Sequence, residues 1–379
     1  MKILIITETF LPSTDGVVTR LTQSICYLRK NKHEVVVIAP DLGVYEYEGA
    51  VIEGVKATTL PFYRYRPFSL PQTKVKEIIE KHQPDLIHVV NPAILGASGV
   101  YYAEKLGYPL IASYHTHVPK YFDYYHLKLL KPLCWSYFRK LHNKADLNLC
   151  TSEAVQKELL NKNFFNVHVW QRGVDVNKYH PDHYSSEMRE RLSKGNKDKK
   201  LLLFVGRLAA EKEIHKLHPL LKERDDIHLA IVGDGPERDS LEEIFLDTNT
   251  TFTGFLHGQE LASAFASADA MVFPSTTETL GLVILESMAS GLPVIAAKSE
   301  PTMEQIEEGK TGILYENEDV RSMNLAIEQL YNKNLFNQMK INARNEAERY
   351  SWARPSRQLI DFYEMTLSLN DASVVMDHG

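Results

Sequence analysis

The sequence predicts an α/β protein built from two doubly wound domains, each a parallel sheet covered by helices on both faces. Three observations lead to this prediction. Short apolar runs alternate with longer amphipathic stretches along nearly the whole chain. The apolar runs are continuous, as expected of parallel strands that are buried on both faces. At 379 residues, the chain is long enough for two cores of roughly 150 to 200 residues each.

The predicted strands form two sets, separated by a charged, glycine-containing stretch at 189–200. The first set comprises residues 2–7, 34–39, 86–90, 110–114, 147–150 and 167–170, with helical stretches such as 17–30 and 73–82 between them. The second set comprises residues 201–205, 228–232, 251–255, 270–273, 293–297 and 312–314. We therefore expect domains over 1–185 and 186–350. Ligands bind at the carboxyl ends of parallel strands, so two such edges facing each other would form a cleft.

Composition restricts the class of protein. With 44% hydrophobic and 24% charged residues, the sequence is typical of a globular protein. Its three cysteines, Cys26, Cys134 and Cys150, are too few and too scattered for a disulfide framework or a zinc site. They favour a reducing, cytoplasmic compartment. No window approaches the roughly 18 apolar residues of a membrane-spanning helix, and the apolar run at 3–6 is interpreted as a buried strand.

Charge is unevenly distributed along the chain. Residues 1–180 hold 22 Lys and Arg against 16 Asp and Glu, whereas the remainder holds 21 against 33. The positive balance suggests that the first half meets an anionic partner, either nucleic acid or a phospholipid surface. Nucleic acid is disfavoured because the net charge of the chain is −6 and no RNA-binding motif is present.

Candidate functional residues of the first half follow its strands. Gly16 opens the helix after the first strand, where close backbone approach and free N–H groups would suit an anion; a plain βα turn is the alternative. The stretch is not the G-x-G-x-x-G fingerprint, which argues against an NAD enzyme. His115 and His117 follow the strand at 110–114, where imidazoles can orient a hydroxyl or exchange protons, unless they are structural. No nearby Asp, Glu or Cys completes a metal site.

In the second half, Arg207 and Lys212 follow the strand at 201–205. Two cations there are well placed to neutralise a leaving diphosphate, which would be electrostatic catalysis. Surface charges at a helix start are the alternative, but cations are unfavourable there and need another reason. A further loop after a strand could frame a nucleobase, and its residues are Gly254, Phe255 and Leu256.

The most specific feature follows the strand at 270–273. Glu278 lies in the loop, and Glu286 comes eight residues later on the helix that the loop opens. A carboxylate on the core-facing side of a helix needs a partner, such as a ribose diol. Backbone amides at this helix N-terminus could also cradle a phosphate; they belong to Thr279, Leu280, Gly281 and Leu282. The alternative, a partly exposed helical glutamate, is disfavoured by this spacing.

These residues, in this order, resemble glycosyltransferase family 4 of the GT-B fold, along the chain to about residue 365. The E-x7-E element from Glu278 to Glu286 is a hallmark of that family. Residues 350–352 resemble the segment where the last helix, here 351–370, returns to the N-terminal domain. The resemblance implies two Rossmann-like domains, the N-terminal one for the acceptor and the C-terminal one for a nucleotide sugar. His115 would lie beside the reacting sugar.

The resemblance also implies roles for the other candidates. Gly16, Arg207 and Lys212 would bind the donor diphosphate. Glu278 would bind sugar hydroxyls, and Glu286 would bind the ribose. The configuration at the anomeric carbon would be retained through front-face attack, with the diphosphate accepting the proton of the acceptor. No metal and no cofactor would be required.

Within the family, three stretches look closest to the sulfolipid synthases, which move sulfoquinovose from UDP-sulfoquinovose to diacylglycerol. The stretches are 113–119, 170–175 and 277–282. Lipid mannosyl- and glucosyltransferases that use GDP-mannose or UDP-glucose share much of them. At 299–304 the chain reads Ser-Glu-Pro-Thr-Met-Glu where many members carry Gly-Gly-x-Pro-Asp, a departure that leaves the sugar open. For the sulfonate, Arg172 or Lys120 is the candidate.

Aromatic and basic residues gather in two stretches of the first half, at 63–66 and 120–140. Such stretches suit an anionic bilayer interface, where rings lie at headgroup level and cations attract lipid; a core helix with solvated lysines is the alternative. We therefore expect a lipid acceptor and peripheral attachment to a cytoplasmic or thylakoid membrane face. The residues singled out for acceptor or membrane are Tyr63, Arg64, Lys120, Tyr121, Phe122 and Trp135.

Two functions from other classes stay open. A sugar-nucleotide epimerase of the GT-B fold would share the diphosphate site but would need no lipid surface. A non-catalytic sugar-nucleotide-binding protein is disfavoured because histidine, arginine, lysine and both glutamate candidates are all present.

Overall fold

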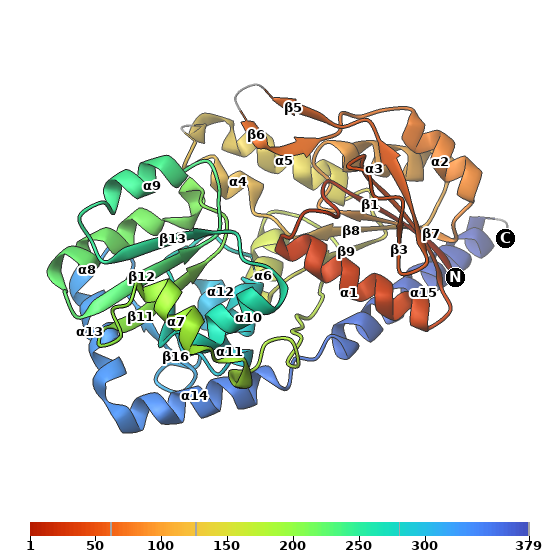
Figure 1. Cartoon of the computed structure of the whole chain (residues 1–379). Helices are drawn as coiled ribbons and strands as arrows, with labels where there is room; N and C mark the ends of the chain where they lie inside the picture. Colours follow the sequence, from red (N-terminus) through yellow and green to blue (C-terminus); the bar gives the residue numbers. More distant parts are fainter. Residues whose placement is uncertain (61–62, 126, 280, 378–379) are drawn as a thin grey trace. The chain divides into compact units, whose positions relative to one another are not determined.

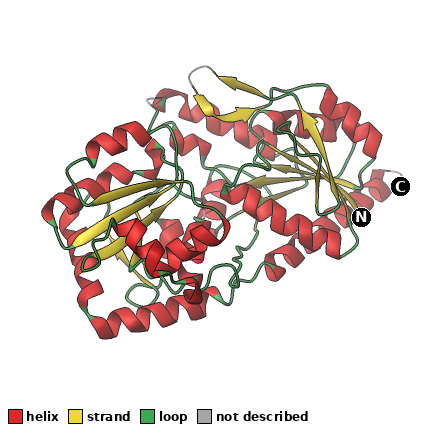
Figure 2. Ribbon diagram, viewed as in Figure 1, coloured by secondary structure: helices red, strands yellow, loops and turns green. Residues whose placement is uncertain are grey.

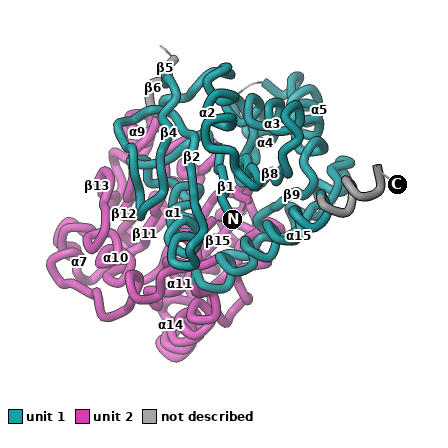
Figure 3. Tube along the Cα trace, turned by 90° about the vertical axis from the view of Figure 1, so that its right-hand side faces the viewer, with its two compact units in different colours: residues 1–172, 352–379 teal, residues 173–351 magenta. Residues whose placement is uncertain are grey.

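The computed structural model describes residues 1–60, 63–125, 127–279 and 281–377, and their side chains except at 60, 63–66 and 371–377. The chain divides into two compact units, coloured separately in Figure 3. The first unit comprises residues 1–172 and 352–379, and the second comprises residues 173–351. Each unit is a largely parallel sheet with helices packed on its faces (Figure 2), which confirms the predicted fold class.

The first unit contains an eight-stranded sheet in the order β10-β9-β8-β7-β1-β2-β4-β3, and only the short β3 runs antiparallel to its neighbour. The main strands are β1 (Lys2–Thr7), β2 (Glu34–Pro40), β4 (Ala50–Val55), β7 (Leu86–Val90), β8 (Leu110–Tyr114), β9 (Leu147–Cys150) and β10 (Val167–Val169). The minor strands are β3 (Glu46–Tyr47) and the separate hairpin β5 (Thr58–Leu60) and β6 (Tyr63–Phe68). The α-helices, labelled in Figure 1, are α1 (Gly16–Lys30), α2 (Lys74–His82), α3 (Leu95–Leu106), α4 (Val118–Tyr121), α5 (Lys131–His142), α6 (Glu153–Asn161) and α15 (Ala353–Asp377). A 3-10 turn, η1 (Lys128–Leu130), precedes α5.

Strand β1 shows why this sheet is buried on both faces. Ile3 and Ile5 point into a core that also holds residues of α1 and α15. Leu4 and Ile6 point into the opposite core, which is closed by α2 and α3. All four side chains are fully buried. A continuous apolar run is therefore what this central strand requires.

The second unit contains a six-stranded, wholly parallel sheet in the order β13-β12-β11-β14-β15-β16. Its strands are β11 (Lys200–Val205), β12 (Ile227–Val232), β13 (Thr250–Gly254), β14 (Ala270–Phe273), β15 (Val294–Ala297) and β16 (Gly312–Tyr315). Its α-helices are α7 (Ser186–Ser193), α8 (His218–Glu223), α9 (Arg238–Ile244), α10 (Gly258–Ser267), α11 (Leu282–Ala289), α12 (Glu300–Met303), α13 (Val320–Glu328) and α14 (Lys333–Ala347). Short 3-10 turns are η2 (Pro181–His183), η3 (Ala210–Lys212), η4 (Ile214–Leu217) and η5 (Gln329–Tyr331).

The boundary between the units lies at Arg172, whereas the sequence-based domain extended to residue 185. Val174 and Tyr179 lie in a core of the second unit, and the Val174 N–H donates to the Tyr350 carbonyl at 2.7 Å. These contacts attach the segment after Arg172 to the second unit. The last helix, expected over 351–370, is α15 and runs to Asp377.

Helix α15 is tied to the first unit by buried hydrogen bonds. The indole N–H of Trp170 donates to the Pro355 carbonyl at 2.9 Å. The Tyr363 hydroxyl contacts Nδ1 of His88 on β7 at 2.9 Å, and Nε2 of that ring contacts the Ser113 hydroxyl at 2.9 Å. Burial lowers the pKa of His88 to about 3, so the ring is neutral and both its nitrogens depend on hydroxyl partners.

We predict that Tyr363→Phe lowers the free energy of unfolding of the first unit by about 1 to 3 kcal/mol, because it leaves a buried imidazole nitrogen without a partner. Urea denaturation followed by tryptophan fluorescence measures this loss. Tyr45→Phe is the control, since that ring is 68% exposed in the same unit and its change should cost less than about 0.5 kcal/mol. Equal losses in the two variants would contradict the prediction.

Candidate active site

The second sheet has a switch point between β11 and β14. These neighbouring strands are the first and fourth of the unit, and the chain leaves them toward opposite ends of the sheet. In open parallel sheets, a crevice for ligands forms at this position beyond the carboxyl ends of the strands. The loops there are 206–213, after β11, and 274–281, after β14. Half of the predicted donor-binding residues lie in these two loops.

Two of the predicted residues meet across the switch point. The Lys212 ammonium contacts the Glu278 carboxylate, and both side chains are less than one-fifth exposed. Arg207, at the start of the same loop, contacts the buried carboxylate of Glu211. Both cations are thus held by carboxylates beside the switch point, and these contacts fix their positions. An anion placed there would meet two oriented positive groups.

Two glutamates that the sequence analysis did not select join the loops. The Glu211 backbone carbonyl accepts hydrogen bonds from the hydroxyls of Ser275 at 2.9 Å and Thr277 at 3.3 Å. The Glu213 carboxylate accepts the N–H of Thr276 at 3.0 Å and its hydroxyl at 2.9 Å. Glu213 adopts the left-handed conformation, with φ of 54°, which is uncommon for a residue other than glycine. Its side-chain bonds favour this strained geometry and hold the loop of Glu278 in place.

Helix α11 begins at the end of the second loop. Gly281 precedes it with φ of 67°, and the position of a Cβ there would lie 3.0 Å from the Phe273 ring. Thr279 is buried, Leu282 is the first residue of the helix, and Leu280 lies outside the described residues. The left-handed turn requires glycine at position 281 because any side chain would be both strained and crowded.

Glu286 lies on α11 in a largely desolvated position. Burial raises its pKa, while the charge of Lys178 and a hydrogen bond from the Tyr179 hydroxyl oppose that rise. Burial and the nearby carboxylate in turn raise the pKa of Tyr179. The expected partner of Glu286 was a ligand, and the fold already supplies one hydrogen bond from Tyr179. A carboxylate has further lone pairs, so a diol can still bind it.

The third predicted group lies farther along the sheet. Gly254 ends β13, the edge strand, which is separated from β11 by β12. At the usual strand spacing this is roughly 10 Å from the loop of Arg207. Phe255 is 57% exposed and stacks on His257 with ring centroids 5.9 Å apart, whereas Leu256 is buried. Phe255 therefore offers a flat apolar surface near the carboxyl edge of the sheet.

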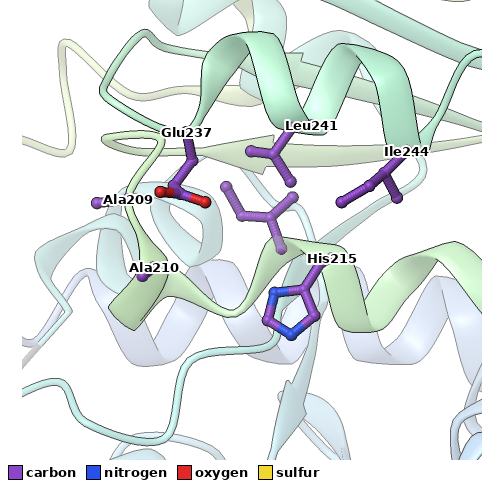
Figure 4. Close-up of a pocket in the computed structure, with 7 residues that line it drawn as sticks. Ala209, Ala210, His215, Glu237, Leu241 and Ile244 are labelled. Atoms are coloured by element: carbon purple, nitrogen blue, oxygen red, sulfur yellow. The ribbon is translucent and has the colours of Figure 1, made fainter. Parts of the chain in front are cut away.

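A small pocket lies between the loop after β11 and helix α9 (Figure 4). Its volume is about 70 Å³, well below the roughly 300 Å³ of a small-molecule site. The lining residues are Ala209, Ala210, Ile214, His215, Glu237, Leu241 and Ile244. None of the predicted donor-binding residues lines this pocket, so it is separate from the predicted site.

In the first unit, Gly16 begins α1, but the amides beside it are not open to a ligand. The Asp15 carboxylate accepts the N–H groups of Val17 at 2.9 Å and Val18 at 3.1 Å. The expectation of free N–H groups at this helix start therefore needs correction, because a capping side chain already satisfies two of them. Donor binding by Gly16 itself stays a prediction.

The switch point of the first sheet, between β1 and β7, is occupied by a side chain of the protein. The Glu8 carboxylate, just after β1, accepts four backbone N–H groups at the start of α3, at 2.8 to 3.1 Å. These donors belong to Ala93, Ile94, Leu95 and Gly96. A helix N-terminus is a natural anion site, and here Glu8 fills it.

His115 follows β8 and is partly buried. Its Nε2 contacts the Ser113 hydroxyl at 2.9 Å, and its ring lies edge-on to Trp170 with centroids 5.6 Å apart. Burial lowers its pKa well below the usual value, and the charge of Arg20 adds to the effect. His115 is therefore neutral at physiological pH, which suits an imidazole that orients a hydroxyl rather than one that carries charge.

His117 and Lys120 share one carboxylate. His117 is buried and its Nε2 contacts Glu158 at 2.8 Å, while the Lys120 ammonium lies 3.0 Å from the same oxygen. Burial works against the ionised form of Glu158, but His117 and Lys120 together lower its pKa to about 2. Lys120, one of two candidates for a sulfonate, thus has a carboxylate partner within the fold.

The aromatic-basic stretch at 120–140 is divided between core and surface. Trp135 packs on Tyr114, His117 and Phe164 in a core cluster, with centroid distances of 5.5 to 6.4 Å. Tyr121 and Phe122 are partly buried. Four leucines are exposed together with Tyr125 and Tyr137, and we call Leu127, Leu129, Leu130 and Leu133 the leucine patch. Tyr63 and Arg64 belong to β6, and their side chains lie outside the described part.

The described residues contain neither a membrane-spanning helix nor a cluster of metal-ligating side chains. In that part of the chain, no helix is both long and apolar enough to cross a membrane. Across the same residues, no group of three or more His, Cys, Asp and Glu side chains is arranged to hold a metal ion. The predicted independence from metals stays a prediction.

Two Rossmann-like units in one chain place the protein among the two-domain α/β proteins of the GT-B class. A family model described as glycosyl transferases group 1 matches residues 187–346, and one described as glycosyltransferase family 4 matches residues 14–178. A sucrose-phosphate synthase from Thermosynechococcus elongatus has the same fold, with a TM-score of 0.78, 19% identity and coverage of 97% of this chain and 99% of that one. The chain belongs to glycosyltransferase family 4, as its sequence resemblance predicted.

Characterised relatives differ in the sugar that their names give. A sulfoquinovosyl transferase of Arabidopsis thaliana is 37% identical over 89% of this chain and 68% of its own length. A GDP-mannose-dependent α-mannosyltransferase of Corynebacterium glutamicum is 32% identical over 98% of this chain and 90% of its own. An α-monoglucosyldiacylglycerol synthase of Streptococcus pneumoniae is 32% identical over 83% and 75%.

We predict that Gly281→Ala lowers the stability of the second unit by more than Gly309→Ala does. Both glycines have φ near 70°, so alanine costs about 1 to 2 kcal/mol at either site. Only Gly281 has a ring 3.0 Å from the new Cβ, whereas nothing lies within 4 Å at Gly309. Urea denaturation gives the two stabilities. Equal losses would show that the Phe273 contact is relieved by a small shift and does not fix the turn.

Proposed function

We propose that this chain is a retaining, metal-independent glycosyltransferase that moves sulfoquinovose from UDP-sulfoquinovose to diacylglycerol. The main support for a nucleotide-sugar donor is the contact of Lys212 with Glu278 across the switch point. Arg207 lies in the same loop as Lys212 and adds a second cation. The 37% identity to a sulfoquinovosyl transferase favours this sugar over others. Transfer of glucose from UDP-glucose or mannose from GDP-mannose is the alternative, supported by the other two relatives.

In the proposed reaction, Lys212 and Arg207 bind the donor diphosphate and stabilise the negative charge that develops as it leaves. Their carboxylate partners hold the two cations in position before the donor binds, so little reorganisation accompanies the reaction. Glu278 accepts hydrogen bonds from sugar hydroxyls, and Glu286 accepts them from the ribose. Phe255 offers an exposed ring against which a nucleobase can stack.

The transfer itself balances without a further reactant. The acceptor hydroxyl oxygen forms a bond to the anomeric carbon on the face from which the diphosphate departs. The bond between that carbon and the diphosphate oxygen breaks, and the hydroxyl proton moves to the departing phosphate. Neutral His115 orients a hydroxyl of the reacting sugar through a hydrogen bond, without adding positive charge.

We further propose that the first unit meets the lipid acceptor at the cytoplasmic or thylakoid face of a membrane. The leucine patch places Leu129 at 95% exposure and Leu133 at 68%. Lys128 and Lys131 lie between these leucines in the sequence, and the charge balance of the first half is positive. Exposed leucines beside lysines are suited to an anionic bilayer, because apolar side chains enter it while cations attract its headgroups.

A donor panel tests the proposed function. Purified protein is mixed with diacylglycerol liposomes and UDP-sulfoquinovose, UDP-glucose or GDP-mannose, and lipid products are identified by mass. A sulfoquinovosyl lipid is the expected product. Product only from another donor would reject sulfoquinovose but keep the transferase. Release of a free epimerised sugar nucleotide, without lipid product, would favour the epimerase.

We predict that Lys212→Ala lowers kcat/KM for the active donor by about 100-fold to 1,000-fold, the usual cost of removing one electrostatic stabiliser of a transition state. Lys222→Ala is the matched control, because its ammonium is half exposed on α8 and its nearest carboxylate is 3.8 Å away. Its kcat/KM should stay within twofold of wild type. A Lys212→Ala enzyme of near-normal activity would remove this residue from the proposed site.

We predict that the double substitution of Leu129 and Leu133 by Asp lowers the affinity of the protein for anionic liposomes at least tenfold. Co-sedimentation with the liposomes measures this affinity. Burial of two leucines in a bilayer contributes roughly 3 kcal/mol or more, and new carboxylates are repelled by anionic lipid. Leu246→Asp is the control, since that residue is 78% exposed in the second unit. Unchanged liposome binding by the double variant would locate the membrane contact elsewhere.

A further inference from the structure

Arg20 carries a positive charge deep in the first unit. It lies on α1 and is only 2% exposed. Its guanidinium stacks on the Trp170 ring, 4.3 Å from the centroid, and its Nη2 donates to the carbonyls of Gln171 at 2.7 Å and Trp170 at 3.3 Å. Its Nη1 is buried and has no hydrogen-bond partner. One edge of the guanidinium is therefore satisfied and another is not.

The charge of Arg20 lacks a counter-ion among the described residues. Four partly buried arginines each contact a carboxylate; the pairs are Arg189–Asp269, Arg207–Glu211, Arg224–Asp226 and Arg344–Glu348. In the described part of the chain, the contacts of the Arg20 guanidinium are with two carbonyls and an aromatic ring. Burial lowers its pKa to about 9, so it stays protonated at neutral pH. A buried charge without a counter-ion is costly, so an anion that paired with it would recover part of that cost.

A second cation and a neutral donor lie near Arg20. Arg172 follows Trp170 by two residues, is partly exposed, and is close enough for its charge to oppose that of Arg20. His115 packs edge-on against Trp170, the same ring on which Arg20 stacks. Arg172 and His115 are both partly exposed, so the cluster around Arg20 has an outer part that solvent reaches. Two arginines with an imidazole make a favourable set of donors for a tetrahedral oxyanion.

We propose that Arg20 and Arg172, with His115 beside them, form an oxyanion-binding subsite in the first unit. Its ligand is a group with three terminal oxygens on sulfur or phosphorus. If the proposed function holds, on which this choice of ligand rests, that group is the sulfonate of the transferred sugar or the phosphate of an anionic lipid. The oxyanion pairs with the partly exposed Arg172 and lies close enough to Arg20 to supply the missing counter-ion.

Anion titration tests the subsite without any turnover. The melting temperature of the full chain is measured in sodium sulfate or sodium phosphate against sodium chloride of equal ionic strength. Saturating UDP is present throughout, so that the diphosphate site of the second unit is filled. A ligand that binds the folded protein raises its melting temperature with concentration. We expect sulfate and phosphate to raise it above the chloride control in the wild-type protein.

The variants decide whether the shift belongs to this cluster. Arg172→Ala alters a partly exposed residue, and Arg20→Lys keeps the buried charge but loses the planar fork. Both should lose most of the anion-dependent shift, whereas Arg139→Ala, on α5 of the same unit, should retain it. No anion-specific shift in the wild type, or full shifts in both variants, would overturn the proposal. If Arg20→Lys does not fold, Arg172→Ala alone decides.

Kinetics then separate the two sources of the oxyanion. The ratio of kcat/KM for UDP-sulfoquinovose over UDP-glucose, measured with diacylglycerol, should fall at least tenfold in Arg172→Ala if the subsite binds the sulfonate. If instead only the ratio of kcat/KM for phosphatidic acid over diacylglycerol falls, the ligand of the subsite is the lipid phosphate. An equal loss for all substrates would overturn a ligand-binding role. If no donor is used at all, the proposed function fails, and the anion titration still tests the subsite.

Discussion

Both units depend on the same constraint, which is the attachment of the two loops at the switch point of the sheet, after β1 and β7 in the first unit and after β11 and β14 in the second. The two strands of each pair are neighbours in the sheet, but the chain leaves them in opposite directions, so their loops are held together by non-covalent contacts. In each unit a glutamate from the loop after the first strand of the pair binds backbone amides that follow the second strand. Glu8 accepts four N–H groups at the start of α3, and Glu213 accepts the N–H and hydroxyl of Thr276. In the second unit the contact between Glu213 and Thr276 positions Glu278 against Lys212, and the proposed site depends on this contact.

Much of the fold was predictable because buried parallel strands need continuous apolar runs, and those runs are visible in the sequence. The twelve predicted strands agree with the structure to within about one residue at most ends. The strands between β2 and α2 were not predicted. Among them, β3 has only two residues, and β4 contains Glu53 and Gly54, which interrupt the apolar pattern. Arg20 was missed for a similar reason. A charged residue on an amphipathic helix is ordinarily solvated, and no local pattern indicates that this one faces Trp170, which is 150 residues away in the sequence.

The position of the domain boundary follows from the chemistry of Glu286. A carboxylate on a mostly apolar helix costs free energy unless a donor reaches it, and Tyr179 is that donor. Tyr179 also packs edge-on against Phe265, with centroids 5.5 Å apart, so the segment after Arg172 is part of the second core. The sequence shows a charged stretch at 189–200 and suggests a linker near it. The actual boundary depends on tertiary contacts of Val174 and Tyr179, which have no sequence signal of their own.

Relatives whose names give sulfoquinovose, mannose and glucose belong to one family, so the shared fold does not by itself select a sugar. Selection requires a group whose energy differs between substrates. The cations of the second unit already have carboxylate partners and would treat any nucleotide diphosphate alike. Arg20 is different because it is buried and lacks a counter-ion among the residues that the structure describes. If Arg20 belongs to an oxyanion subsite, an anionic substrate supplies its counter-ion, whereas a neutral sugar or lipid leaves a desolvated charge unpaired. Discrimination would then come as much from the cost imposed on neutral substrates as from attraction of the charged one.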